Sequence, residues 1–440
     1  MKIDRRQFIA GGLASLLITP LLHRVAHAGT PAKKLIVILA RGAWDVANVF
    51  DPREPGDANV DGPWRQLPGG EIDYTTEKIA RAGNLTFGYN DTNGSIGYRP
   101  NVSSFFSEWS DLCVVVNGVS SGTIVHDLAR TRVLTGGRDT SPDLGAIFGH
   151  EKKGSAPIGY MDFSGEARIG NLGASTAQIG QRGQLEILLN DEITGIPGPQ
   201  GSGWTYPIFA PTAGDHDAIQ AWLTKRENRL KTGWEDGGPN SQQLANLLGS
   251  RTAAADLRAS SDELNELINL GANMDLATQL DLGIKLLNDE LCQSVLLDTG
   301  FGWDTHDDNS EQNGLFDQLF AGLKYLGSEL TRQKLEDEVL VVVLSEFTRT
   351  PKLNATGGKD HWPVISSLLF GAGIEGGRTI GKTSETLGSE PVNLSTGAYD
   401  ANGTVPDYGN LIAGILDAAG IENIGDYLPG STPYSAIKGV

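Results

Sequence analysis

Acidic and imidazole side chains gather in the segment TGFGWDTHDDN, residues 299–309, which follows the apolar run SVLLD. Asp304 and His306 lie two positions apart, so in an extended backbone their side chains project to the same side and could reach one ion. Crowded carboxylate and imidazole groups need a cation or open water to relieve them. An exposed acidic loop and a metal site are both compatible with this segment alone.

Comparable side chains flank four other apolar runs of strand length. They are Asp45 after LIVILA, His126 after LCVVVNG, Glu346 and Arg349 after VLVVVLS, and His361 before VISSLLFGAG. Ligands of open α/β sheets bind outside the carboxyl ends of the strands, so we expect these groups to converge. Oxygen and imidazole donors without a thiolate suit zinc, manganese, magnesium or calcium. The predicted ligands of this divalent metal ion are Asp45, Asp304, His306, Glu346 and His361.

The apolar runs are continuous rather than alternating, which is typical of strands buried on both faces of a mainly parallel sheet. Apolar residues at intervals of three and four predict helices over 276–292, 314–333 and 408–420. Strands that alternate with helices indicate an α/β sandwich. Residues 29–440 are therefore predicted to form one large domain, and the Gly- and Pro-rich range of about 150–240 is predicted to be an insertion of loops and short strands.

The first 28 residues have the features of a twin-arginine export signal. They contain Arg5 and Arg6, a weakly apolar stretch, and a small-x-small cleavage site at residues 26–28. The apolar stretch is shorter than the roughly 20 residues that a membrane-spanning helix needs, although a retained anchor is the alternative. We expect a periplasmic or secreted protein with no stable membrane span after signal removal.

Charge and cysteine content restrict the partners and the chemistry. The formal net charge is -19, and removal of the basic signal makes the chain more acidic still. A field of this sign disfavours nucleic acid and anionic membrane surfaces, although a local cationic site can still hold an anionic substrate. Cys113 and Cys292 are the two cysteines. They could pair or remain as buried thiols, and they exclude a cysteine-based metal site.

The segments RGAWD, TGFGWDTH, LSEFTRTP and KDHWP, taken in this order, resemble the signature of domain-of-unknown-function family 1501. This family is an exported branch of the alkaline phosphatase and sulfatase superfamily, and the resemblance covers nearly the whole mature chain. It implies an alkaline-phosphatase-like three-layer sandwich with a central, mostly parallel sheet. It also implies a metal cluster at the carboxyl ends of the strands.

The resemblance further implies individual roles for the predicted metal ligands. Asp45 corresponds to the superfamily's first-strand ligand, and Glu346 stands where a strand-end aspartate usually lies. His361 resembles the downstream histidine ligand. Asp304 and His306 resemble the Asp/His pair of the other metal position.

Two departures from the superfamily pattern leave the catalytic residues open. Phe347 follows Glu346 where the superfamily commonly has histidine, and HDLARTRVLTGGR resembles a sulfatase segment in which His126 takes the place of the nucleophile. His126 is then a nucleophile, a ligand or a helix cap, or else Ser121 or Thr123 serves as the nucleophile.

Two functions are compatible with this pattern. The first is an exported metal-dependent hydrolase of phosphate or sulfate esters, with His126, Ser121 and Arg349 as its catalytic candidates. Arg349 could hold the anionic ester bidentately or form a simple ion pair. The second is a non-catalytic, metal-stabilised binding protein of the same fold. The expected partner is a small anionic ester or a glycan, and the sequence leaves the substrate, the metal and the oligomeric state open.

Overall fold

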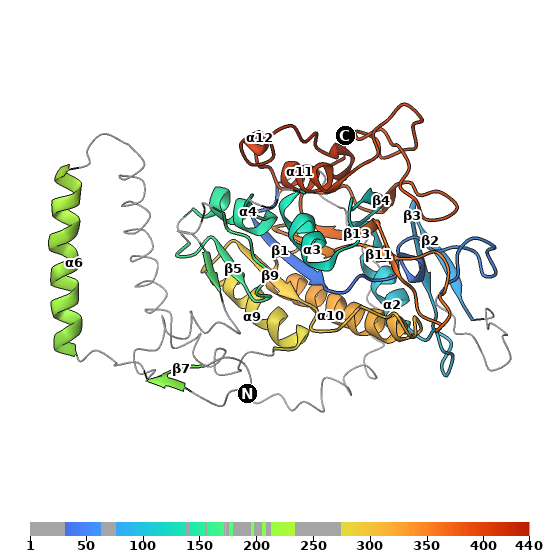
Figure 1. Ribbon diagram of the computed structural model, residues 1–440, viewed down its shortest axis with the longest axis horizontal. Coiled ribbons are helices and arrows are strands. Elements are labelled where there is room, and N and C mark those ends of the chain that lie inside the picture. Colours follow the sequence, from blue (N-terminus) through green and yellow to red (C-terminus); the bar gives the residue numbers. More distant parts are fainter. Residues whose placement is uncertain are drawn as a thin grey trace.

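The architecture is that of a mixed α/β sandwich (Figure 1). The structure, a computed structural model, describes residues 31–62, 76–137, 139, 141–154, 156–170, 172, 176–178, 195–197, 205–207, 213–233 and 274–439. The predicted export signal lies outside these residues.

An eight-stranded sheet forms the centre, in the order β14-β4-β13-β10-β1-β9-β5-β6. All neighbouring pairs are parallel except those of β13, which is antiparallel to both β10 and β4. The predicted mostly parallel sheet is confirmed. The strands are β1 (Lys34–Ala40), β4 (Cys113–Ser120), β5 (Tyr160–Asp162), β6 (Thr176–Gln178), β9 (Ser294–Asp298), β10 (Val339–Ser345), β13 (Val364–Gly371) and β14 (Arg378–Gly381).

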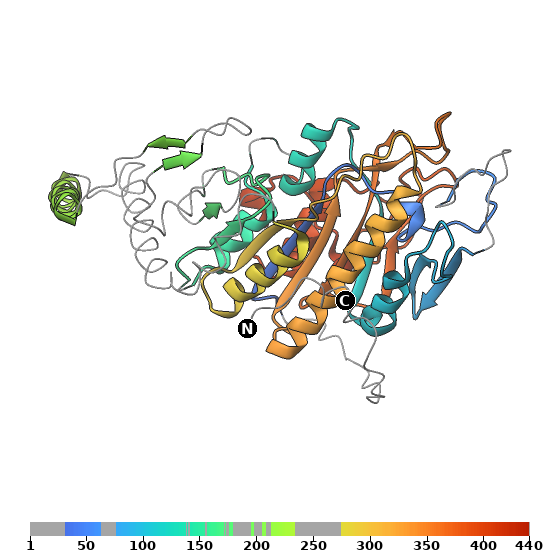
Figure 2. The same ribbon diagram turned by 90° about the horizontal axis from the view of Figure 1, so that it is seen from below.

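Helices cover both faces of this sheet, as Figure 2 shows from below. Alternate residues of β1 point to opposite faces of the sheet. Ile36 and Ile38 pack in one hydrophobic core, and Leu35 and Val37 pack in the other. This alternation explains why the strand is apolar throughout. One core includes α2 (Pro100–Trp109), α9 (Leu276–Asn288) and α10 (Glu311–Gln333), and the other includes α3 (His126–Thr135), α4 (Leu144–Lys152) and α11 (Tyr408–Ala418).

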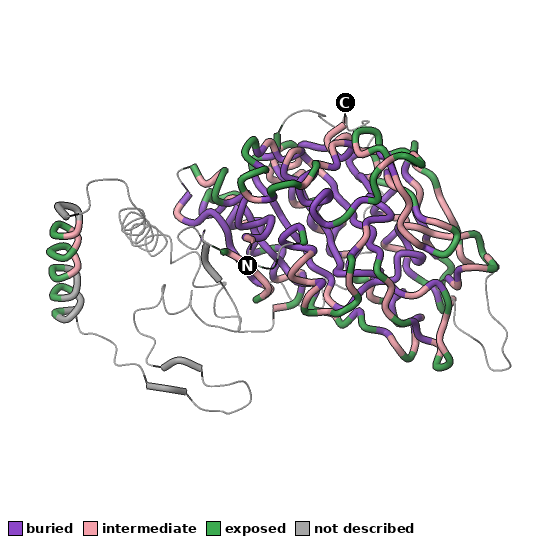
Figure 3. Tube along the Cα trace, turned by 45° about the horizontal axis from the view of Figure 1, so that its top comes forward, coloured by how far each residue is buried: buried purple, intermediate pink, exposed green. Residues whose placement is uncertain are grey.

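The predicted three-layer sandwich is therefore confirmed, and the buried residues concentrate within it (Figure 3). None of the described helices is long and apolar enough to cross a membrane. Cys113 and Cys292 are buried, unpaired thiols that belong to the same hydrophobic core.

The range of about 150–240 contains more regular structure than the predicted loops and short strands. β5 and β6 extend the central sheet, β7 (Gly195–Pro197) pairs with β8 (Thr205–Pro207), and α6 spans Ala213–Gly233. The α6 sequence is rich in Ala, Leu, Lys, Arg, Glu and Gln, which favour helix. The Gly- and Pro-rich flanks conceal this helix in the sequence.

The carboxyl ends of four strands meet at one edge of the sheet. β1, β4, β9 and β10 run in the same direction, so their carboxyl ends meet at this edge. Antiparallel β13 begins there, because Val364 pairs with Ser120 at the end of β4. Beside it, the short strands β11 (Thr348–Arg349) and β12 (His361–Trp362) pair with each other. The topology thus gathers five distant segments.

Candidate metal centre

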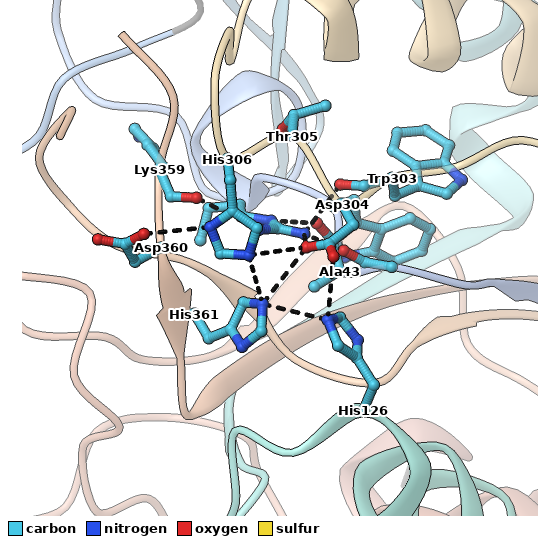
Figure 4. A network of polar contacts seen from close by, with 12 residues as sticks. Ala43, His126, Trp303, Asp304, Thr305, His306, Lys359, Asp360 and His361 are labelled. Carbon is cyan, nitrogen blue, oxygen red and sulfur yellow. Dashed lines mark hydrogen bonds and ion pairs between the residues drawn. The ribbon is translucent and has the colours of Figure 1, made fainter. Parts of the chain in front are cut away.

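Three histidines and one aspartate point toward one another at this edge (Figure 4). His126 is the first residue of α3, and Asp304 and His306 lie in the loop between β9 and α10. His361 begins β12. The Nε2 atom of His361 lies 3.1 Å from that of His126 and 2.9 Å from that of His306. The structure thus brings together one residue predicted to be catalytic and three predicted to be metal ligands.

The Asp304 carboxylate completes this cluster. Its oxygens lie 3.4 Å from His126 Nε2, 3.1 Å from His306 Nε2 and 3.3 Å from His361 Nε2. Ligand atoms that surround one ion tetrahedrally, about 2.0–2.2 Å from it, lie roughly 3.4 Å apart. One ligand atom from each of His126, Asp304 and His361 lies within 4.8 Å of the other two, so the three groups could share one ion. The spacing and chemistry of these three groups therefore fit a divalent metal, and His306 lies beside them through its contacts with His361 and Asp304.

The other ring nitrogen of each histidine is occupied by an acceptor. Nδ1 of His126 lies 2.9 Å from Glu346 Oε1, and Nδ1 of His306 lies 3.1 Å from Asp360 Oδ1. Nδ1 of His361 lies 2.9 Å from the carbonyl oxygen of Ile124. Each acceptor favours a proton on Nδ1, which leaves the Nε2 lone pair directed into the cluster. Such lone pairs repel at 2.9–3.1 Å unless a proton or a cation lies between them.

Arg349 forms an ion pair with Asp304. Burial alone would raise the pKa of the Asp304 carboxyl, but the hydrogen bond and charge of Arg349, together with His126 and His361, lower this pKa. Nη2 of Arg349 lies 2.6 Å from Asp304 Oδ1. The remaining guanidinium donors bind the backbone carbonyl groups of Gly42, Ala43, Trp303 and Lys359. Arg349 is fully buried, so these contacts suit it to positioning Asp304 rather than to clamping a substrate.

The environment of His361 favours a neutral imidazole. Burial lowers the pKa of this ring, and the charges of Arg349 and His126 lower it further, against the hydrogen bond to Asp304. A metal ligand must be neutral at its coordinating nitrogen, so this shift suits coordination. Phe347 packs beneath the cluster, with ring centroids 4.6 Å from His361 and 4.8 Å from His126. Phe347 is therefore an apolar support for these two imidazole rings.

Asp45, predicted as a ligand, makes contacts of another kind. Its carboxylate lies 2.7 Å from Nζ of Lys359, and both side chains are fully buried. Asn309 donates to the same oxygen at 2.8 Å, while the other oxygen accepts from the Ala47 amide at 3.1 Å. Asp45 thus caps the short 3-10 helix η2 (Val46–Asn48). Lys359 lies two residues before His361, so this ion pair ties the β1 loop to the ligand-bearing strand.

Glu346, also predicted as a ligand, lies behind His126. Its Oε1 atom accepts from the Gly42 amide at 2.8 Å as well as facing His126. Its Oε2 atom is buried and has no hydrogen-bond partner among the described residues. A free carboxylate oxygen in a buried setting is costly. Glu346 orients His126 through one oxygen and keeps the other available to a cation.

Ser121, a predicted catalytic residue, is separate from these contacts. Its hydroxyl donates to the carbonyl of Thr123 at 2.6 Å, and its amide donates to the carbonyl of Pro363. The side chain is buried. These bonds shape the turn that leads from β4 to His126 and do not direct the hydroxyl to the four donors. Its catalytic role stays a prediction.

A polar cleft of about 410 Å³ adjoins the cluster. Its lining includes His126 and Asp304 together with two arginines, Arg41 and Arg130. Arg41 directly follows β1, and Arg130 lies one helical turn after His126 on α3. The cleft therefore places two guanidinium groups beside the predicted metal position.

Four residues that contribute to this site were not among the predicted site residues, namely Arg41, Arg130, Lys359 and Asp360. Arg130 could have been found from its spacing of four residues from His126, which puts both on one helix face. Asp360 and Lys359 were visible only as neighbours of His361 in the quoted KDHWP segment. Their partners, His306 and Asp45, are far away in sequence, so no local signal identified these pairs.

A sequence profile of the family described as "Protein of unknown function (DUF1501)" matches residues 239–406. The family resemblance predicted from the sequence is confirmed over this range. No curated protein sequence matches the chain.

Solved structures with distant likeness come from several proteins. Ps i-CgsB in complex with k-i-k-neocarrahexaose is 11% identical, with 92% of this chain and 76% of that chain covered at a TM-score of 0.37. The lipoteichoic acid synthase LtaP from Listeria monocytogenes is 9% identical, with 93% and 75% covered at 0.37. The phosphonate monoester hydrolase SpPMH from Silicibacter pomeroyi is 12% identical, with 91% and 77% covered at 0.32.

Proposed function

We propose that this chain is an exported hydrolase of phosphate or sulfate esters that depends on a divalent metal ion. The ion would be held by His126, Asp304, His306 and His361. The observation that carries this proposal is the convergence of three Nε2 atoms and a carboxylate at 2.9–3.4 Å, with the Nδ1 atom of each ring already occupied. In metal sites, too, a ligating histidine donates its other ring N–H to an acceptor and directs its free lone pair to the ion.

When bound, a divalent ion supplies Lewis-acid chemistry that polarises an ester oxygen. The side chains of this protein provide the remaining functions. Glu346 and Asp360 hold the Nδ1 protons of His126 and His306, and Arg349 keeps Asp304 ionised. Arg41 and Arg130 line the adjoining cleft, where guanidinium groups can bind the oxygens of an anionic ester.

The second candidate is a non-catalytic, metal-stabilised binding protein. It is favoured by the position of Ser121, whose hydroxyl is used by the backbone of Thr123. Among the described residues, no serine or threonine hydroxyl hydrogen-bonds to the side chains of His126, Asp304, His306 or His361, and Thr356 donates to the backbone carbonyl of His306 instead. Hydrolysis by this site would consequently use His126 or water rather than an activated hydroxyl side chain.

Export by the twin-arginine route is part of the proposal. Its support is the paired Arg5 and Arg6, the weakly apolar stretch and the small-x-small motif. This route carries folded proteins, which suits a protein that acquires its metal before it crosses the membrane.

Elemental analysis of protein purified without a histidine tag tests the metal centre. We expect a near-stoichiometric divalent metal in the wild type and its loss in the His306→Ala, His361→Ala double variant. A chelator should lower the melting temperature, and the matching ion should restore it by mass action. A metal-free wild type whose melting curve is insensitive to both chelator and added ions overturns the proposed centre.

Assays with aryl phosphates and aryl sulfates test the reaction. Hydrolysis is expected to disappear with the metal and to return with the ion found by elemental analysis. Protein that is fully loaded but inert on every ester would reject the hydrolase and support the binding protein. Activity that survives complete metal removal would reject metal dependence.

A further inference from the structure

Both carboxylate oxygens of Asp45 are used by donors within the protein. One oxygen accepts from the side chain of Asn309 at 2.8 Å and lies 2.7 Å from Nζ of Lys359. The other oxygen accepts from the Ala47 amide at 3.1 Å. A metal ion bound by Asp45 would therefore have to displace the ammonium group of Lys359 or share its carboxylate oxygen.

The ammonium group of Lys359 lies between oxygen atoms, as a metal ion would. Its Nζ atom is 2.6 Å from the backbone carbonyl oxygen of Asp61 and 2.7 Å from Asp45 Oδ2. Calcium binds carboxylate and carbonyl oxygens at about 2.3–2.6 Å. The same two kinds of oxygen thus surround this lysine nitrogen at only slightly longer distances.

A second buried cation, Arg349, connects Lys359 to the histidine cluster. Its Nη1 atom donates to the backbone carbonyl of Lys359 at 3.2 Å, and its Nη2 atom lies 2.6 Å from Asp304 Oδ1. Burial lowers the pKa of this guanidinium, whereas the charges of Asp304, Asp45 and Glu346 act in the opposite direction. Three carboxylates are therefore close to one guanidinium group.

One further carboxylate oxygen, Oε2 of Glu346, is buried and has no hydrogen-bond partner among the described residues. Metal ions in proteins take about four or more ligands, so this oxygen does not hold an ion by itself. In two-metal sites the ions lie about 3.5–4 Å apart, so the carboxylates around the first ion also have to face the second. Here Asp304 faces Arg349 and Asp45 faces Lys359 instead.

We infer that the metal centre holds a single ion and that the ammonium group of Lys359, together with the guanidinium group of Arg349, takes the place of a second one. This inference rests on the proposed function and specifies the stoichiometry of its metal. Both basic side chains are fully buried and neither lines the cleft. A ligand in the cleft therefore contacts one ion, and Lys359 is a positioning residue that acts through Asp45.

The metal content of the full chain tests the inference directly. Protein stripped with a chelator is saturated with zinc, manganese or calcium, each alone, and passed through a desalting column before elemental analysis. We expect a plateau at one ion per chain for the ion that binds. A plateau at two ions per chain overturns the inference, and so does a protein that retains none of the three ions.

The variant Lys359→Ala tests whether the ammonium group fills the place of an ion. It leaves the Asp45 carboxylate and the Asp61 carbonyl oxygen without their cation, so this variant should retain two ions per chain at saturation. Lys352→Ala is the matched control, because Lys352 pairs with the carboxylate of the same Asp61 but is half exposed, and it should retain one ion. A folded Lys359→Ala protein that still saturates at one ion overturns the role of Lys359.

The Asp45→Asn, Lys359→Ala double variant makes the test independent of the folding of Lys359→Ala. It leaves no uncompensated buried charge, and it should retain one ion with the affinity of the wild type. The same change of carboxylate to amide in the cluster, Asp304→Asn, should weaken binding by roughly 100-fold or more. Loss of the ion from the double variant would show that Asp45 is a ligand of this ion and would overturn the inference.

Hydrolysis assays on the same preparations separate this inference from the proposed function. One ion per chain without hydrolysis of any ester rejects the hydrolase and leaves the single-ion centre in place. Two ions per chain with hydrolysis reject the single-ion centre and support the hydrolase.

Discussion

Carboxylates of the metal centre and carboxylates beside β5 are compensated in different ways. At the metal centre, Asp45 pairs with Lys359 and Asp304 pairs with Arg349. At the β5 end, Asp143 is held by neutral donors: the amides of Ala146 and Arg168 and the hydroxyl of Tyr160.

The two regions consequently differ in how firmly the charge is retained. Burial raises the pKa of Asp143 to about 7, although its hydrogen bonds act in the opposite direction. Arg349 lowers the pKa of Asp304 instead. Asp143 is fully buried, whereas the Asp304 side chain is 46% exposed, so less desolvation opposes the effect of its cation. At Asp298, which is almost fully buried, burial raises the pKa despite the adjacent Arg41. Metal ligands need an environment like that of Asp304, because they must be deprotonated to bind.

The largest expected effect comes from breaking the buried ion pair. Lys359→Met leaves the fully buried Asp45 without its cation and should lower the free energy of unfolding by about 3–5 kcal/mol. Urea denaturation measures this change. Combining it with Asp45→Asn should recover part of the loss, because no uncompensated charge remains.

Lys352→Met provides the matched control for that experiment. Lys352 pairs with Asp61 at the surface with its side chain half exposed, so its loss should cost less than about 1 kcal/mol. If the Lys352 and Lys359 variants are equally stable, burial does not set the strength of the pair at Asp45.

The next effect concerns turnover. His126→Ala should reduce hydrolysis of an aryl phosphate or sulfate by roughly 100-fold or more, because it removes a donor from the metal centre. The exposed His150 on α4 supplies the control, and His150→Ala should leave turnover unchanged. If the His126 variant keeps full activity and loses at most about 1 kcal/mol of stability, then His126 only caps the helix and takes no part in turnover.

A smaller effect appears in the pH dependence of stability at Asp143. The folded state retains a proton that the unfolded chain has lost, because burial raises the folded pKa of Asp143 to about 7, well above the ordinary pKa of an aspartate. Stability should therefore fall by about 2 kcal/mol as the pH rises from about 5.5 to 8. Denaturation at several pH values should give a flatter profile for Asp143→Asn. Parallel profiles for the wild type and this variant would show that Asp143 does not titrate in this range.

The smallest effect is expected from an exposed pair. Arg332 lies 2.6 Å from Glu329 on α10, but its side chain is 65% exposed. Water and salt screen such pairs, so Arg332→Ala should leave the denaturation midpoint unchanged. A clear shift would mean that exposed pairs also contribute, and the contrast between buried and exposed charges would weaken.

The strands of the sandwich were predictable because burial on both faces produces continuous apolar runs. SVLLD and VLVVVLS coincide with β9 and β10, and the predicted helix over 408–420 corresponds to α11. Strand direction was not predictable in the same way, since antiparallel β13 is a buried, mainly apolar run like the parallel strands of the sheet. Direction depends on the connections between strands, which the composition of one strand does not record.

The candidate site was predictable as a set of residues and not as a set of contacts. Carboxylates and histidines beside strand ends identified the four donors, because parallel strands bring these ends together. The sequence could not show that Lys359 neutralises Asp45 or that Glu346 lies behind His126. Those partners are hundreds of residues apart, and only packing selects them. The roles of the individual residues stay predictions until metal and activity are measured.

The separation of the donors along the chain has a kinetic consequence. His126 and His361 are 235 positions apart, although their Nε2 atoms lie 3.1 Å from each other. Closing a loop of that length in an unfolded chain costs roughly 5 kcal/mol in entropy, so an ion gains little by capturing the unfolded polypeptide. The complete donor set exists only after β4, β9, β10 and β13 have assembled. Metal loading should thus follow folding, and a chaperone that kept the chain unfolded would also keep it metal-free.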